Sequence, residues 1–170
     1  DIYQRARRAL RYAVRHGCTA MRSHVEIAAY VGLRGVEAMQ QVQAECTGVL
    51  DLQLVAFAQE GLFHDNVTPG MLREALQMGL PVLGGCPYRD QDQRRHIDWC
   101  FETAEAFNVP LDFHADSSDD PALLTCTYIA EQTLARGMQG RFVRGHLCTL
   151  DMLAPEQRTR VIVLLQRAHI

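Results

Sequence analysis

Apolar positions along the chain alternate between helical spacing and short continuous runs. The first helical stripe begins at Ile2 and stops before Gly17, a residue type that commonly ends helices. Short apolar runs bounded by polar residues follow and are typical of strands buried in a parallel sheet. This pattern predicts strands over residues 18–25, 52–57, 81–85, 111–114 and 141–145, and helices over 2–14, 33–46, 69–78, 97–104 and 120–136 and from 155 onward.

The expected strands end at a regular interval. Their ends fall near residues 25, 57, 85, 114 and 146, which are 28 to 32 residues apart and indicate a repeated βα unit. Parallel neighbours need a crossover, so five such units predict an α/β fold with helices packed on a parallel sheet. An open doubly wound sheet fits the length, whereas a helix before the first strand and a stop before a sixth strand suggest a section of a (β/α)8 TIM barrel.

Composition narrows the class of protein. Hydrophobic residues make up 48% and charged residues 22%, as expected for a chain that folds around a core. The net charge of -3 gives no support for nucleic acid or an anionic membrane surface as a partner. The longest uncharged stretch, Ala75 to Tyr88, is too short to cross a bilayer. The six scattered cysteines contain no CxxC pair, which favours buried free thiols and a reducing, cytoplasmic location.

Polar residues recur at the carboxyl ends of the expected strands, the edge that carries the ligand site in parallel α/β folds. A single histidine there is more often a hydrogen-bonded structural residue, but a shared edge favours a common site. Histidine and carboxylate groups together can bind a divalent metal and activate its water for hydrolysis. The residues concerned are His24, Gln59, Glu60, Tyr88, His114, Asp116 and His146.

Other chemical motifs are absent. The chain has no Walker phosphate loop and no GxGxxG turn, which disfavours nucleotide binding. It has no GxSxG elbow either, so no serine stands in the context of an activated nucleophile.

Four segments resemble a known family in order and spacing. They are Arg22-Ser23-His24-Val25-Glu26, Ala56-Phe57-Ala58-Gln59-Glu60-Gly61, His114-Ala115-Asp116 with Asp119-Asp120, and Gly145-His146. As a set they resemble the cytosine deaminase branch of the metal-dependent amidohydrolase superfamily. The resemblance implies a TIM barrel, of which residues 1–170 would form a partial domain, roughly the second to sixth βα units. It also implies hydrolytic removal of an amino group from a small heterocycle.

The resemblance assigns roles to individual residues. His114 matches a metal ligand, Gln59 matches the glutamine that hydrogen-bonds the substrate ring, and His146 matches a histidine that assists the reaction. It implies one divalent metal ion, zinc or iron, with further ligands outside this chain. His24 and Glu26 match a segment whose expected role is support of the site.

One position departs from the family. Ser117 stands where the family has its catalytic glutamate, and a hydroxyl cannot replace a carboxylate in shuttling protons. Asp116 is the nearest candidate for a catalytic carboxylate, whereas Asp120 is better explained as a helix cap before Pro121.

Three questions of function stay open at this stage. The substrate is expected to be a small heterocycle, either a cytosine-like amine or another ring amine or cyclic amide of triazine, pterin or creatinine type. A catalytically inactive, ligand-binding relative is a different class of answer, because the family's carboxylate is missing. Assembly into a homo-oligomer is also open.

Overall fold

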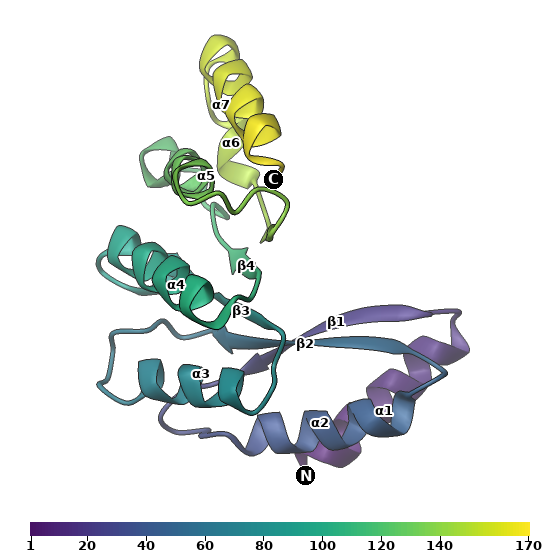
Figure 1. Cartoon of the computed structure of the whole chain (residues 1–170). Helices are drawn as coiled ribbons and strands as arrows, with labels where there is room; N and C mark the ends of the chain where they lie inside the picture. The colour runs from purple at the N-terminus through teal and green to yellow at the C-terminus, as the bar shows by residue number, and fades with distance from the viewer.

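The computed structural model describes residues 1–170 and contains one sheet of five parallel strands (Figure 1). Each strand pairs with the strand that precedes it in the chain, in the spatial order β1-β2-β3-β4-β5. The strands are β1 (Ala20–Glu26), β2 (Asp51–Ala58), β3 (Val82–Gly85), β4 (Leu111–His114) and β5 (Phe142–Gly145).

Helices connect the strands and cover one face of the sheet (Figure 1). They are α1 (Ile2–Arg15), α2 (Arg34–Cys46), α3 (Thr68–Gln77), α4 (Gln93–Phe107), α5 (Cys126–Ala135), α6 (Cys148–Asp151) and α7 (Pro155–Ala168), with short 3-10 turns η1 (Pro87–Arg89) and η2 (Pro121–Leu123). None of these helices is both long enough and apolar enough to cross a membrane.

The strand order decides between the two predicted architectures. A doubly wound sheet reverses its strand order at a switch point and carries helices on both faces. Here the order never reverses and the helices lie on one side, which is the arrangement of a TIM barrel. The chain therefore forms a half-barrel of five βα units, and the predicted fold class is confirmed.

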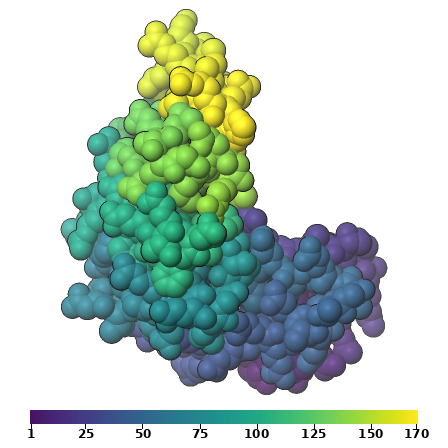
Figure 2. Space-filling view, in the orientation of Figure 1, coloured from purple at the N-terminus to yellow at the C-terminus, as the bar shows by residue number.

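The two faces of the sheet differ in what they bury. Between the sheet and the helices lies a core of 27 buried residues. On the opposite, concave face the buried apolar cluster has only four members, which are Val55, Phe57, Val82 and Cys86. Figure 2 shows the molecule hollowed on this helix-free side. The concave face is therefore where polar side chains can gather without disturbing the core.

Most predicted elements are confirmed, and β4 has the predicted bounds. The helix expected over 120–136 is partly wrong. Its first residues form the separate turn η2, capped by Asp120, and α5 begins only at Cys126. The reason is a tertiary contact: the Asp116 carboxylate accepts hydrogen bonds from the amides of Thr125 and Cys126 and so fixes the start of α5 there. All six cysteines are free thiols, as predicted, but burial is confirmed only for Cys86, Cys100 and Cys126, whereas Cys46 is half-buried and Cys18 and Cys148 are exposed.

Gly84 in β3 keeps the concave face open. A Cβ atom there would collide with the backbone oxygen of Asp112 and come within 2.8 Å of the Phe57 ring. Side chains of β2 and β4 can therefore approach one another over β3.

Replacing Gly84 with alanine should destabilise the chain by about 1–3 kcal/mol, because the added methyl overpacks against rigid backbone. Urea unfolding followed by circular dichroism measures the change. Gly70→Ala is the matched control, since a Cβ there meets nothing within 4 Å and should stabilise α3 by up to about 1 kcal/mol. Equal unfolding midpoints for the two variants would contradict the close approach at Gly84.

Candidate active site

Three histidines converge on the concave face at the carboxyl ends of the strands. His24 comes from β1, His114 ends β4, and His146 directly follows β5. The ring of His114 lies 4.6 Å from that of His24 and 5.1 Å from that of His146, measured between centroids. Phe57 of β2 packs against both His24 and His114, at 4.6 and 5.1 Å. The structure thus brings together three of the residues that the strand-end pattern singled out.

A buried carboxylate, Asp112, lies beneath these rings. It precedes His114 by two residues in β4, and its side chain is only 3% exposed. The Arg22 guanidinium donates to one carboxylate oxygen at 2.7 Å, and Nε2 of His24 lies 3.4 Å from the other. Two strands separate β1 from β4, so this contact spans the concave face.

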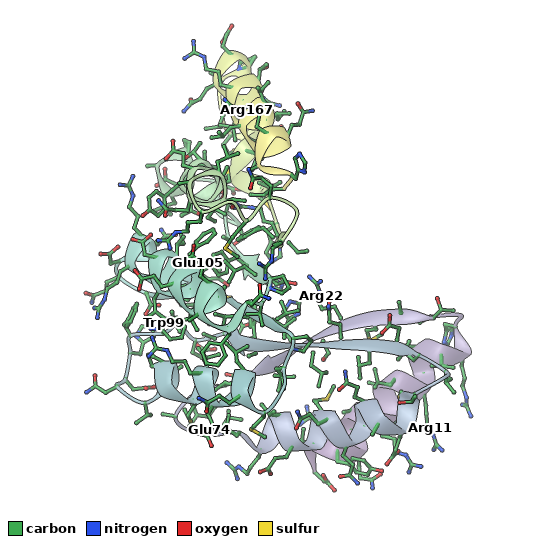
Figure 3. The ribbon with its side chains drawn as sticks, in the orientation of Figure 1. Arg11, Arg22, Glu74, Trp99, Glu105 and Arg167 are labelled. Carbon is green, nitrogen blue, oxygen red and sulfur yellow. The ribbon has the colours of Figure 1, made fainter.

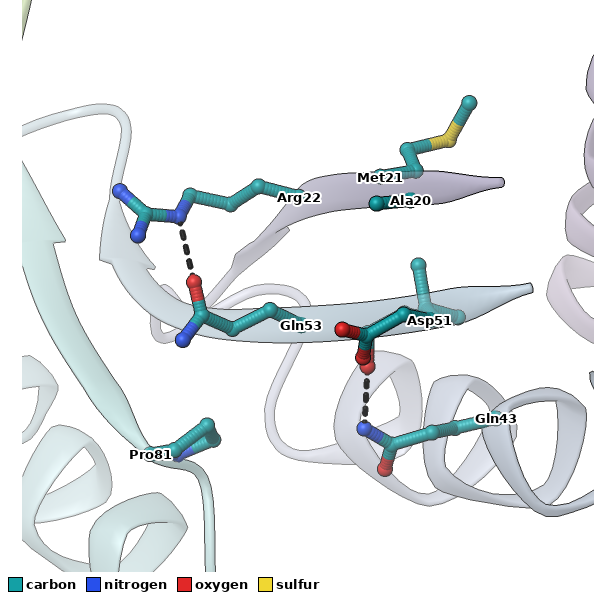
Figure 4. A pocket seen from close by; sticks show the side chains of 8 residues that line it. Ala20, Met21, Arg22, Gln43, Asp51, Gln53 and Pro81 are labelled. Atoms are coloured by element: carbon teal, nitrogen blue, oxygen red, sulfur yellow. Dashed lines mark hydrogen bonds between the residues drawn. The ribbon is translucent and has the colours of Figure 1, made fainter. Parts of the chain in front are cut away.

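Arg22 is itself held in place. Its Nε donates at 2.7 Å to the side-chain oxygen of Gln53, the residue opposite it on β2 (Figure 4). Figure 3 shows Arg22 on the side of the sheet that carries no helix. The guanidinium thus connects three strands, β1, β2 and β4, through two hydrogen-bonded partners.

These contacts shift the protonation of the site residues. Burial alone would raise the pKa of Asp112, but hydrogen bonding by His24 and Arg22 and the positive charge of Arg22 outweigh burial and lower it. Burial, helped by the neighbouring His24 and His146 rings, lowers the pKa of His114. His114 is therefore neutral at pH 7, the form that can bind a metal through a nitrogen lone pair.

Asp112 and Arg22 were not predicted as site residues. A signal for Asp112 was present, because alternate residues of a strand share a face, and Asp112 and His114 are two apart. The pairing of Asp112 with Arg22 gave no sequence signal, since these residues are 90 positions apart.

A divalent metal fits the donor atoms at this site in chemistry and nearly in geometry. Nitrogen atoms of His24 and His114 and an oxygen of Asp112 lie within 4.8 Å of one another. Two ligand atoms bound to one zinc at about 2.1 Å are at most about 4.2 Å apart, so the three donor atoms lie near the separation that a shared metal requires.

Gln59 lies at the same edge, one residue beyond β2, and is half-buried. The loop that follows Gln59 is held by hydrogen bonds to a buried carboxylate, Asp90. Asp90 accepts hydrogen bonds from the amides of Leu62 and Phe63, at 2.8 and 2.9 Å, and pairs with Nδ1 of His96 at 2.6 Å. This buried pair holds the segment that carries Gln59.

The Asp90–His96 pair is entirely buried, and its protonation follows from that. Burial lowers the pKa of His96, although the neighbouring Asp90 partly opposes the shift. Burial would raise the pKa of Asp90, but hydrogen bonds from His96 and the two loop amides lower it overall. The pair is therefore a neutral imidazole beside a carboxylate near pH 7.

Asp116 has a different environment from the three histidines. Its side chain is fully buried and accepts hydrogen bonds from both the amide and the hydroxyl of Thr125, from the Cys126 amide, and from Arg144. Both oxygens are therefore engaged, and the geometry gives this carboxylate a structural role in place of the catalytic one expected for it.

Arg144 links Asp116 to His146. Besides its contact with Asp116, its Nε donates at 3.3 Å to the His146 carbonyl. Asp116 and His146 both have positive φ angles, 55° and 73°, a region that non-glycine residues seldom occupy. Such backbone strain persists where surrounding contacts impose it, and the Arg144 bridge supplies them here.

Four other expected residues lie apart from the histidine cluster or carry no contact with it. Ser117 is exposed on the loop after β4. Glu26 accepts a hydrogen bond from the Tyr30 hydroxyl, Glu60 forms an exposed ion pair with Arg89, and Tyr88 is exposed in η1.

Comparison with known proteins supports the geometry, although no protein-family profile matches the chain. It is 30% identical over 135 residues to N-isopropylammelide isopropyl amidohydrolase of Pseudomonas sp. (strain ADP), covering 78% of this chain and 34% of that protein. It is 26% identical over 170 residues to a pterin deaminase of Rhizobium rhizogenes, covering 100% of this chain and 39% of that protein.

The fold is also that of a solved structure. A 5-methylcytosine deaminase from Klebsiella pneumoniae, crystallised with phosphonocytosine, matches with a TM-score of 0.92 and 26% identity. The match covers 99% of this chain and 42% of the other. The chain thus spans between a third and a little over two fifths of the length of these relatives.

Replacing Asp116 with asparagine should destabilise the chain by about 3 kcal/mol, because it leaves the buried Arg144 without its charge partner. Asp151→Asn is the control, since the Asp151–Arg158 pair is exposed and should contribute less than about 1 kcal/mol. Chemical unfolding of both variants measures the difference. A loss no larger for Asp116→Asn than for Asp151→Asn would mean that the buried pair does not support the fold.

The free energy of unfolding should fall as pH drops through about 6.5, because unfolding returns His96 to its ordinary pKa and the unfolded chain then binds more protons. Asp90, whose pKa is lowered, adds its loss only at more acidic pH. His96→Gln should reduce the dependence between about pH 7.5 and 5.5 and leave the part that comes from His114, whose pKa is also lowered. Urea midpoints across this range provide the measurement, and an unchanged slope in His96→Gln contradicts the assignment.

Proposed function

We propose that this chain, which belongs to the amidohydrolase superfamily among the relatives of cytosine deaminase, forms part of a metal-dependent hydrolase that removes an amino group from a small heterocycle. Residues 1–170 would supply roughly the second to sixth βα units of the enzyme's barrel. The observation that carries the proposal is the convergence of His24, His114 and His146 on the concave face of the half-barrel. Of this chain, 99% matches the structure of a deaminase.

His114 is the residue of this chain that we assign to the metal, zinc or iron, with other ligands from barrel strands outside these residues. Its neutral imidazole, favoured by burial, suits that role. When bound, such a metal supplies an activated water for hydrolysis.

His146 and Gln59 complete the proposed site. His146 is exposed at the strand end with its ring beside His114, where it can carry a proton to or from the reacting centre. The Gln59 amide offers both a donor and an acceptor and can therefore orient the edge of a heterocycle. We leave Asp116 out of the chemistry, because its oxygens are already engaged.

The substrate class follows from the relatives. Their names refer to rings that carry amino or alkylamino groups: a methylated cytosine, a pterin and N-isopropylammelide, a triazine. We propose a cytosine-like amine first, with another ring amine or cyclic amide of triazine, pterin or creatinine type as the alternative. Three further points stay predictions: a cytoplasmic location, the absence of nucleic acid and membrane partners, and a homo-oligomeric state.

Two substitutions in the protein that carries these residues separate the proposed roles. His114→Ala should lose the metal and all turnover, whereas Gln59→Ala should keep the metal and lose at least about tenfold in kcat/KM, as expected when one substrate hydrogen bond is removed. Elemental analysis reports the metal, and ammonia release from cytosine, an aminotriazine and a pterin reports turnover.

The outcomes are separable. Stoichiometric metal in His114→Ala overturns the ligand assignment, and loss of metal from Gln59→Ala overturns the substrate role. A protein that binds metal and heterocycles but turns none of them over is the inactive relative, and the proposed activity then fails.

A further inference from the structure

We propose that Asp112 is a positioning residue that fixes the His24 ring, so that Nδ1 of His24 is presented to the substrate as a hydrogen-bond acceptor for a ring or exocyclic N–H group. The inference rests on the proposed function and names two residues that the comparisons do not assign.

The tautomer of His24 follows from its partner. A carboxylate can only accept hydrogen bonds, so the contact of 3.4 Å between Nε2 of His24 and an Asp112 oxygen favours a proton on Nε2. In the neutral ring the lone pair then lies on Nδ1. That atom has no hydrogen-bonding partner within the chain, and the side chain is 29% exposed, so it is available to a ligand.

The ring has little freedom to turn. It packs edge-on against Phe57 and His114, whose rings also contact each other at 5.1 Å between centroids. The carboxylate that orients it is equally constrained, because Arg22 holds the second oxygen and Gln53 holds Arg22. His24 is therefore fixed beside His114, the residue assigned to the metal.

Arg22 also argues against Asp112 as a metal ligand. The guanidinium donates to Asp112 at 2.7 Å, and a second cation on the same carboxylate would be repelled by it. With only 3% of the side chain exposed, Asp112 is also out of reach of a substrate. Of its two partners, His24 is the one whose ring lies against His114, so we assign the effect of Asp112 to His24.

Nitrogen-15 NMR of the histidine side chains tests the tautomer in the unaltered protein. We expect His24 as the Nε2–H tautomer, and Asp112→Asn to weaken or reverse this preference because the amide can donate as well as accept. Asp98→Asn is the matched control: Asp98 accepts a hydrogen bond from the Tyr128 hydroxyl on the helical face and should leave His24 unchanged. An Nδ1–H tautomer in the unaltered protein overturns the proposal without any variant.

Metal and kinetics provide the second test. Asp112→Asn and His24→Ala should keep the metal content, raise KM for the aminated heterocycle about tenfold or more, and change kcat less, since a substrate contact is lost. Loss of metal from both variants would make His24 and Asp112 ligands and overturn the positioning role. If no heterocycle is turned over but the tautomer depends on Asp112, the proposed function fails and the positioning of His24 stands.

Discussion

The structure depends on the way in which the chain connects successive strands of the sheet. Each strand lies beside the preceding one, and the crossover helices α2, α3 and α4 pack against the same side of the sheet, while α7 packs on α5. The apolar residues that form the core follow them there. The opposite face is left concave, and its strand ends present side chains toward a common space. The location of the site is therefore a consequence of the winding of the chain.

Within that space the electrostatics of a single buried carboxylate organise the neighbours. An unpaired Asp112 would be strongly unfavourable at 3% exposure, so it requires Arg22 and gains from His24. Both partners come from β1, which β2 and β3 separate from β4, and they can reach Asp112 because β3 contributes Gly84 at the point of crossing. The ion pair between Arg22 and Asp112 thus depends both on the absence of a side chain at Gly84 and on the order of the strands.

The sequence predicted the strands well because apolar runs and their spacing report burial directly, and β4 matches its predicted bounds. The start of α5 was mispredicted because a carboxylate ten residues earlier, Asp116, satisfies the first amides of the helix, a contact that local propensity does not contain. Strand-end position predicted that His24, His114 and His146 would meet. It could not predict that Asp116 has a different environment, because that depends on tertiary contacts. That residue shares their edge and yet faces Arg144 and α5.

If Ser117 occupies the position of the family's catalytic glutamate, as the sequence resemblance implies, few groups of this chain can move protons at this edge. Asp112 and Asp116 are buried with both oxygens engaged, and Asp120 caps a turn. Asp119 is exposed on the loop, with no hydrogen-bonding partner to fix its distance from the histidines. His146, by contrast, is held at its carbonyl by Arg144 and lies with its ring against His114. Under the proposed function, His146 is therefore the group of this chain that we assign to proton exchange with the reacting centre, and the Asp116–Arg144 pair would contribute by fixing its backbone.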